Sequence, residues 1–276
     1  MNRHDISKLI IERLNEIGIN YLKKKYEESG KINHLIIEKV LPNEIATKLS
    51  EYFPEEEELN HLVGPQENKY VGVYFSNKQK LVEECIYAFQ EKNLIQIISE
   101  ITNIKTLIGD PELYAGGISS MSKGCFLNPH IDNSHDRNLE NFRRLNILYY
   151  VNKEWNSKEG GGELLLFPNG IKHNAEEITC DFNRLVIMRT DNRSLHGVKR
   201  IRSESERRKC ISNYYFSKIS PSGKNYYHST SFRGFKREFV KGTYLKLNAL
   251  SRTFAKRLIH KLTKFSVSTG YHRKNN

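Results

Sequence analysis

Residues 125–132 read CFLNPHID, a short apolar strand that ends in His130 and Asp132. Alternate residues of a strand point to the same face, so this imidazole and this carboxylate can reach a single ion. Two histidines and one carboxylate on one face of an octahedral metal form an arrangement typical of non-haem iron(II). Taken alone, His-x-Asp is a weak signal, because a turn aspartate beside a surface histidine gives the same spacing.

The position of a second histidine strengthens this interpretation. His196 follows the apolar strand RLVIMRT (184–190) and the polar turn DNRS (191–194), and another strand comes after it. His135, His173 and His228 are the other candidates for a third ligand, but they lie in polar, loop-like stretches. The sequence therefore predicts a metal site made by His130, Asp132 and His196.

The surrounding segment, 113–217, is a series of short strands separated by Gly, Asn, Asp and Pro, as expected for an antiparallel sandwich or small barrel. Its predicted strands are YAGGISSM, CFLNPHID, RRLNILYYV, GELLLF, RLVIMRT, HGVKRI and KCISNYYFS. Before it, apolar residues at helical spacing predict helices at 5–28, 78–90 and 93–102, with Asp5 as the first N-cap. HLIIEKV (34–40) is a predicted strand, and Pro42 and Asn43 open a further helix.

Charge is distributed unevenly along the chain. Residues 220–276 contain 13 Lys/Arg and one acidic residue, Glu238, so the total of 44 Lys/Arg and 32 Asp/Glu leaves 44 − 13 = 31 and 32 − 1 = 31 for residues 1–219. A neutral body thus carries a basic C-terminal extension. No stretch approaches ~18 uninterrupted apolar residues, so no membrane partner is expected. The four scattered cysteines indicate a reducing compartment, and a cytoplasmic protein is expected.

Alternation along ERRKCISNYY predicts which arginine faces inward. Arg208, Cys210, Ser212 and Tyr214 share one face, whereas Lys209 is on the other and would be costly to bury without a partner. Arg208 is therefore the predicted inward arginine, and its guanidinium fork matches a carboxylate.

A series of motifs, taken in order, resembles the core of the 2-oxoglutarate/iron(II) oxygenase superfamily, near its prolyl 4-hydroxylase-like branch. The motifs are GCFLNPHID, RRLNILYYVNKEW, GGELLLF, NRLVIMRT, SLHGV and RRKCISNYYF. The resemblance covers residues 113–218. It implies an α+β, mainly β fold: a double-stranded β-helix (jelly roll) with N-terminal helices outside and a C-terminal basic helix. The expected parts are a helical part at 1–107, the oxygenase core at 108–219 and the basic extension at 220–276.

The resemblance also implies roles for individual residues. His130, Asp132 and His196 match the iron ligands, and Arg208 matches the residue that binds the distal carboxylate of 2-oxoglutarate. The spacing from His196 is longer than usual, which leaves Arg207 as an alternative. Tyr150 matches a position that helps to bind 2-oxoglutarate, and Asn146 is its neighbour on the same strand face.

The implied activity is hydroxylation of an unactivated C–H bond, with dioxygen as oxidant and 2-oxoglutarate converted to succinate. Asp132 favours hydroxylation, because halogenating relatives have a small residue there. The expected cofactors are Fe(II), 2-oxoglutarate and ascorbate as reductant. The substrate is a prolyl or other peptidyl residue, or alternatively a small molecule such as an amino acid, sugar or secondary metabolite. Recognition loops are predicted at 63–80 and 133–142.

The competing hypothesis is a catalytically silent β-helix domain that binds a partner through its basic tail. A helix is predicted near 251–265, with Phe254, Leu258, Leu262 and Phe265 on one stripe. We expect this stripe to pack on the core, because an electrostatic arm needs no apolar stripe. Nucleic acid is not an expected partner, since no nucleic-acid motif is present.

Overall fold

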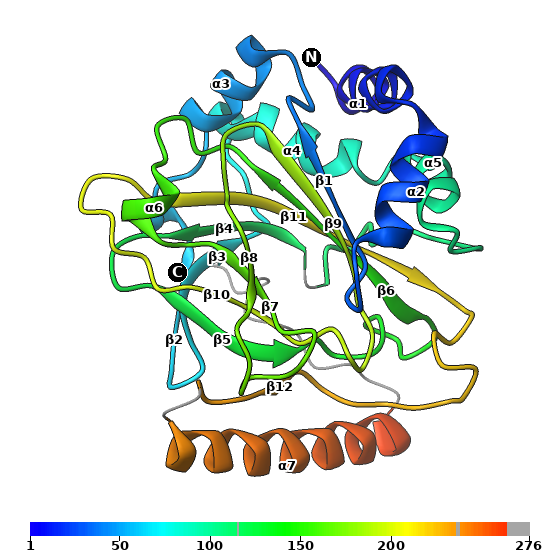
Figure 1. The fold of residues 1–276 in the computed structure, drawn as a ribbon, viewed down its shortest axis with the longest axis vertical. Coiled ribbons are helices and arrows are strands. Elements are labelled where there is room, and N and C mark those ends of the chain that lie inside the picture. Colours follow the sequence, from blue (N-terminus) through cyan, green and yellow to red (C-terminus); the bar gives the residue numbers. More distant parts are fainter. Residues whose placement is uncertain (115, 236–237, 264–276) are drawn as a thin grey trace.

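The computed structural model describes residues 1–114, 116–235 and 238–263 (Figure 1). Its centre is a curled, antiparallel sheet of 12 strands, and seven α-helices are found in the described part. The strands are β1 His34–Glu38, β2 Asn60–Val63, β3 Glu67–Gly72, β4 Gly117–Met121, β5 Phe126–Ile131, β6 Phe142–Tyr150, β7 Leu164–Leu166, β8 Glu176–Ile178, β9 Arg184–Arg189, β10 His196–Val198, β11 Arg208–Ser217 and β12 Ser231–Phe232. The helices are α1 Arg3–Ile17, α2 Ile19–Glu28, α3 Asn43–Glu51, α4 Lys80–Ala88, α5 Lys92–Thr102, α6 Ser157–Gly160 and α7 Phe239–Thr263.

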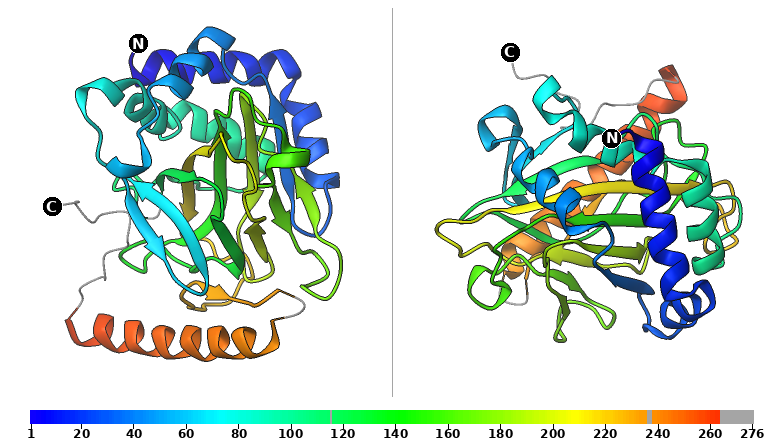
Figure 2. Two further views of the ribbon diagram at one scale, coloured as in Figure 1. Left: turned by 90° about the vertical axis from the view of Figure 1, so that its left-hand side faces the viewer. Right: turned by 90° about the horizontal axis from the view of Figure 1, so that it is seen from above.

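The strand order is β1-β9-β6-β11-β4-β3-β5-β10-β7-β8, with β12 added to β5 and β2 added to β3. The sheet curls into a half-barrel of the jelly-roll type, with helices against its outside (Figures 1 and 2). The double-stranded β-helix predicted from the sequence is therefore confirmed. The first 107 residues supply β1, β2 and β3 as well as helices, and the domain boundary at residue 107 stays a prediction.

Alternation along β6 shows how the sheet separates two environments. Leu145, Ile147 and Tyr149 belong to the large core that the helices cover. Leu148 and Tyr150 point to the other side, into a smaller cluster inside the curl. Period-two alternation of the side chains thus builds a helix-covered outer face and an inner face that can hold a site.

The N-terminal helices pack on the outer face through apolar positions at helical spacing. In α1 these are Ile6, Ile10 and Leu14, all fully buried. Asn2, not the predicted Asp5, is the N-cap: its side chain accepts a hydrogen bond from the Asp5 amide, and Asp5 caps the Asn2 amide in return. Asp5 is thus the distal partner of a capping box, three residues inside the cap.

An ion pair fixes α1 to α4. The Arg3 guanidinium lies 3.0 Å from one Glu84 carboxylate oxygen, and the Arg3 amide donates to the other at 2.7 Å. The hydrogen bond from Arg3 lowers the pKa of Glu84 to about 2, although burial opposes this shift. An unfolded chain has a glutamate pKa of about 4.3. The pair therefore stabilises the fold above that pH, and this contribution is lost as the pH falls towards 2.

Glu84→Gln should lower the free energy of unfolding at neutral pH by about 1–2 kcal/mol, because it removes the charged partner of Arg3. The effect is smaller than the full pKa shift would give, since solvent screens part of the interaction at the half-exposed Arg3. Urea unfolding at several pH values measures this. The variant should lose less stability than the wild type between pH 4.3 and 2. Glu83→Gln on the same helix, where Glu83 pairs with the exposed Lys80, is the matched control. Equal acid sensitivity of Glu84→Gln and the wild type would contradict the assignment.

The C-terminal helix differs from the prediction. It begins at Phe239, earlier than residue 251, and buries Leu245 and Ala249. Phe254 is 70% exposed and Leu258 47% exposed, so the expectation that this stripe packs on the core is wrong for both residues. The helix carries apolar residues on two sides, and the side opposite the predicted stripe packs against the rest of the protein. The Leu262 side chain and Phe265 lie outside the described part.

Two further features bear on predictions about recognition loops and membrane spans. Most of the predicted recognition loop at 63–80 is structured: β2 and β3 form a hairpin that extends the sheet. In the described part of the chain, no helix has the length and apolar character needed to cross a membrane.

Candidate metal centre and cavity

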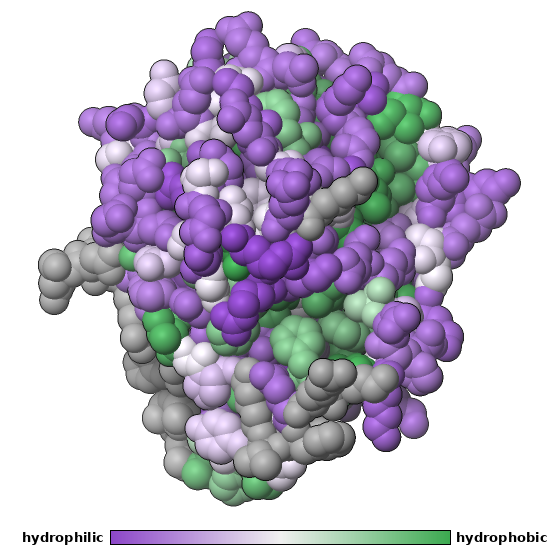
Figure 3. Space-filling view, turned by 60° about the vertical axis from the view of Figure 1, so that its left-hand side comes forward, coloured by the Kyte–Doolittle hydropathy of each residue, from purple (hydrophilic) through white to green (hydrophobic). Residues whose placement is uncertain are grey.

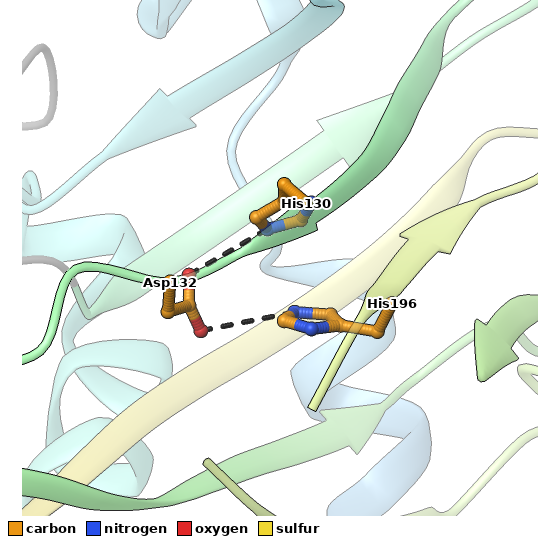
Figure 4. Close-up of side chains that lie close together, drawn as sticks. All are labelled: His130, Asp132 and His196. Atoms are coloured by element: carbon orange, nitrogen blue, oxygen red, sulfur yellow. Dashed lines mark ion pairs between the residues drawn. The ribbon is translucent and has the colours of Figure 1, made fainter. Parts of the chain in front are cut away.

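The two predicted histidine ligands are brought together by strand pairing. β5 and β10 are antiparallel neighbours, and His130 lies directly opposite His196 in their register. Asp132 follows the end of β5 and points back between the two rings (Figure 4). His130 Nε2 is 3.5 Å from Asp132 Oδ1, and His196 Nε2 is 3.7 Å from Asp132 Oδ2. One potential ligand atom from each of the three lies within 4.8 Å of the others.

Backbone carbonyls orient both imidazoles. His130 Nδ1 lies 2.9 Å from the Asn128 carbonyl oxygen, and His196 Nδ1 lies 2.9 Å from the Ser194 carbonyl oxygen. A carbonyl oxygen only accepts, so each Nδ1 must carry the proton and donate it. In this tautomer the lone pair on Nε2 of each ring is directed at the shared centre. A histidine that binds a metal through Nε2 needs this tautomer.

The protonation states of the three side chains also favour binding of a cation. Burial alone would raise the pKa of Asp132, but Arg143 and the two histidines hold it well below its usual range, so the carboxylate is ionised. Burial, and then the neighbouring His130, lower the pKa of His196 to about 4, so its ring is neutral at neutral pH. Asp132 Oδ2 is buried without a hydrogen-bond partner among the described residues. A buried ionised oxygen with no donor fits a position meant for a metal ion.

A cavity of about 220 Å³ opens beside this centre. The predicted face of β11 lines it, with Arg208, Cys210, Ser212 and Tyr214 all on the wall. The other face of β11 contributes Ile211 and Tyr215 to the helix-covered core, and Lys209 donates to the Ser50 carbonyl at 2.8 Å. The alternation predicted from the sequence is confirmed over this strand.

Arg208 is a buried cation in the cavity wall, 3% exposed. Its Nε donates to the Gly162 carbonyl at 2.9 Å, and its Nη2 donates to the Tyr150 hydroxyl at 2.9 Å. Gly162 has a φ of +77°, and a Cβ there would come within 3.2 Å of Arg208 Cδ. Arg207 points to the opposite side, where it binds Glu55 and the Pro54 carbonyl. Of the two candidate arginines, only Arg208 faces the cavity.

Tyr150 and Asn146 occupy different places relative to the cavity. Tyr150 is fully buried, and its hydroxyl accepts the hydrogen bond that fixes Arg208; burial raises its pKa far above neutrality. Asn146 lines the cavity, with Nδ2 at 3.5 Å from the Tyr214 hydroxyl. Its Oδ1 is buried and lacks a hydrogen-bond partner within the described ranges. Direct binding of 2-oxoglutarate by either residue stays a prediction.

Arg143 is a site residue that the sequence did not reveal. It is 2% exposed, its Nη1 lies 3.5 Å from Asp132 Oδ1, and its guanidinium stacks on the Tyr214 ring at 3.9 Å. Strict alternation from Asn146 would place Arg144 inward instead. The pairing of β6 with β11 shifts register next to Arg143, and this irregularity reverses which arginine points inside.

The C-terminal extension also contributes to the cavity, which the sequence did not predict. Thr230, Phe232 and Arg252 line it, and the Phe232 ring stacks on His130 with 5.0 Å between centroids. β12 reaches this position by pairing with β5, the strand of His130. Arg252 lies in α7, so deletion of residues 251–276 would remove part of the cavity wall.

Residues 116–216 match the model of the 2OG-Fe(II) oxygenase superfamily, and this β core belongs to that superfamily. The match includes the three clustered donors and Arg208. Together, the family and the His-Asp-His cluster imply Fe(II) and 2-oxoglutarate as metal and co-substrate.

Individual relatives show the same likeness. The chain is 36% identical to Egl nine homolog 1 of Rattus norvegicus over 70 residues, which are 25% of this chain and 19% of that protein. The chain thus matches about a fifth of that relative's length. Its fold is similar to that of a prolyl hydroxylase from Trichoplax adhaerens, which was solved in complex with a hypoxia inducible factor oxygen degradation domain peptide fragment. The TM-score is 0.50 and the identity 19%, over 78% of this chain and 94% of that one. A Pseudomonas putida prolyl-4-hydroxylase gives TM-score 0.54 and 14% identity over 72% of this chain and 98% of that one.

Proposed function

We propose that the protein is an Fe(II)- and 2-oxoglutarate-dependent dioxygenase that hydroxylates an unactivated C–H bond of an organic substrate. The observation that carries this proposal is the convergence of His130, Asp132 and His196 on one point of a cavity that Arg208 also lines. When bound, Fe(II) and 2-oxoglutarate supply the oxidising chemistry, in which dioxygen is consumed and 2-oxoglutarate becomes succinate and CO2.

Each residue has a defined part in this proposal. His130 and His196 hold the metal through Nε2, and the Asp132 carboxylate completes the set. Arg143 keeps Asp132 ionised and in place. His130, Asp132 and His196 would hold the metal ion, and Arg143 would act on it only through Asp132.

The co-substrate is held from the other end. Arg208 binds the distal carboxylate of 2-oxoglutarate with its guanidinium fork, and the Tyr150 hydroxyl fixes the rotamer of Arg208. Asn146 offers an amide on the same wall. Apolar residues of the same cavity, Leu148 and Leu164, would limit access of water and so strengthen the ion pair.

A catalytically silent module is the alternative from another class. Such a module would not require both Nε2 lone pairs to face an ionised carboxylate, nor a buried arginine beside them. These features favour the active enzyme. We further propose a prolyl or other peptidyl residue as substrate, because the similar structures include prolyl hydroxylases; hydroxylation of a small molecule is the alternative.

The test combines turnover with identification of the product. Purified protein with Fe(II), ascorbate and 2-oxoglutarate should form succinate slowly without substrate and faster with it. Mass spectrometry of proline-containing peptide libraries and of metabolite extracts should find a product heavier by one oxygen atom. The His130→Ala/His196→Ala double variant is the control for metal-independent background. Succinate formation no greater than this control across both substrate panels would refute the proposal.

A further inference from the structure

Helix α7 has two apolar sides, and among the residues that the structure describes only one of these sides is packed against the protein. The docked side buries Leu245 and Ala249, each 3% exposed, and Thr253 hydrogen bonds to Ser229 in the segment before β12. The outer side carries large apolar residues at spacings of three and four, which places them in one stripe along the helix. We call this the outer stripe: Tyr244, Leu247, Leu250, Phe254 and Leu258.

The outer stripe is strongly exposed. Leu247, Leu250 and Phe254 are 63%, 68% and 70% accessible, and Tyr244 and Leu258 are 54% and 47% accessible. Figures 1 and 2 show α7 along one edge of the molecule, with the other described elements on one side of it. Hydrophobic surface is visible at this lower edge in the space-filling view of Figure 3. A continuous apolar stripe of this kind marks an interaction surface.

The charge of α7 indicates which kind of partner surface the outer stripe can bind. Its 25 residues contain no Asp or Glu and six basic residues. Arg252 lines the cavity, and the other five are Lys241, Lys246, Lys256, Arg257 and Lys261. If two copies met through α7, each would bring a basic helix without Asp or Glu against the other, which opposes self-association. An anionic lipid surface supplies both the negative charge and the apolar layer that the stripe needs.

We infer that α7 is an interfacial helix that lies on an anionic lipid bilayer, with the outer stripe inserted among the lipid headgroups. The sequence predicted no membrane partner because no segment can span a bilayer, but a helix that lies in the surface needs no such length. Because the whole stripe faces away from the body, the protein can dock without unfolding. This inference is independent of the proposed catalysis.

The experiment is co-sedimentation of the full chain with vesicles of phosphatidylcholine alone or mixed with phosphatidylglycerol. The wild type should bind the mixed vesicles, more weakly at high salt, and bind pure phosphatidylcholine poorly. Leu250→Glu/Phe254→Glu should weaken binding at least about tenfold, since it adds two negative charges to the stripe. Both side chains are exposed, so the melting temperature should not change.

The matched control is Tyr21→Glu/Ile219→Glu, which makes the same charge change at exposed apolar residues elsewhere, 54% and 51% accessible. It should bind vesicles nearly as well as the wild type. Phe254→Trp gives an independent readout: its fluorescence should shift to shorter wavelength with mixed vesicles, after subtraction of the Trp155 signal measured in the wild type.

Three results would each overturn the inference. These are no binding of the wild type to mixed vesicles, equal binding by the stripe variant, and a Phe254→Trp variant whose added fluorescence is unchanged by mixed vesicles. A concentration-dependent dimer that Leu250→Glu/Phe254→Glu abolishes, without vesicle binding, would assign the stripe to a second copy of the chain instead.

Discussion

Replacing both His130 and His196 with alanine should abolish succinate formation and metal binding while leaving the fold intact. Loss of an outer-shell partner of a metal ligand typically costs roughly 10- to 100-fold in affinity, and removal of two direct ligands should cost more. The wild type should gain thermal stability when Mn(II) is added, because a ligand that binds only the folded state stabilises it. The double variant should show no such gain.

His173→Ala is the control for this experiment, because His173 is exposed and lies away from the cluster. It should bind metal and turn over like the wild type. A double variant that still shows the Mn(II)-dependent rise in melting temperature would move the metal site elsewhere in the chain.

Arg208→Ala should raise the KM for 2-oxoglutarate by at least about tenfold, with metal binding retained. A charge-assisted hydrogen bond contributes about 1.5–3 kcal/mol, which corresponds to roughly ten- to 150-fold. Arg208→Lys should recover only part of the loss, because an ammonium lacks the planar fork. Initial rates at varied 2-oxoglutarate, together with a Mn(II) titration, separate the two effects.

Arg207→Ala is the matched control on the opposite face of β11, where it would break the contacts to Glu55 and Pro54. It should leave this KM unchanged. If Arg207→Ala raises the KM and Arg208→Ala does not, Arg208 has another role in the cavity wall.

Among the site residues that the sequence predicted, Arg208, Tyr150 and Asn146 lie in regularly paired parts of β11 and β6. Arg208 and Tyr214 keep their alternation because β11 pairs without a break with β4 and β6 over those positions. The cross-strand approach of His130 and His196 follows from the pairing of β5 with β10, and the sequence predicted the residues but not their register.

The parts that the sequence missed depend on irregularity or on distant contacts. Arg143 points inward because of a register shift, which alternation cannot anticipate. In α7 both sides have apolar residues at helical spacing, so the choice between Leu245 and Phe254 as the docked side depends on the position of β12. The β2–β3 hairpin is half-exposed and polar, and therefore gives little hydrophobic signal.

Because the C-terminal extension contributes to the cavity, the parts of the site are synthesised in a fixed order. During synthesis, the chain acquires its last proposed metal ligand at His196 and completes β11 at Ser217. Phe232, which stacks on His130, and Arg252 are made later. A growing chain can therefore assemble its metal donors before the wall beside them exists. This part of the cavity wall is the last part of the site to be made, and a chain that stops before Phe232 would have the donors without it.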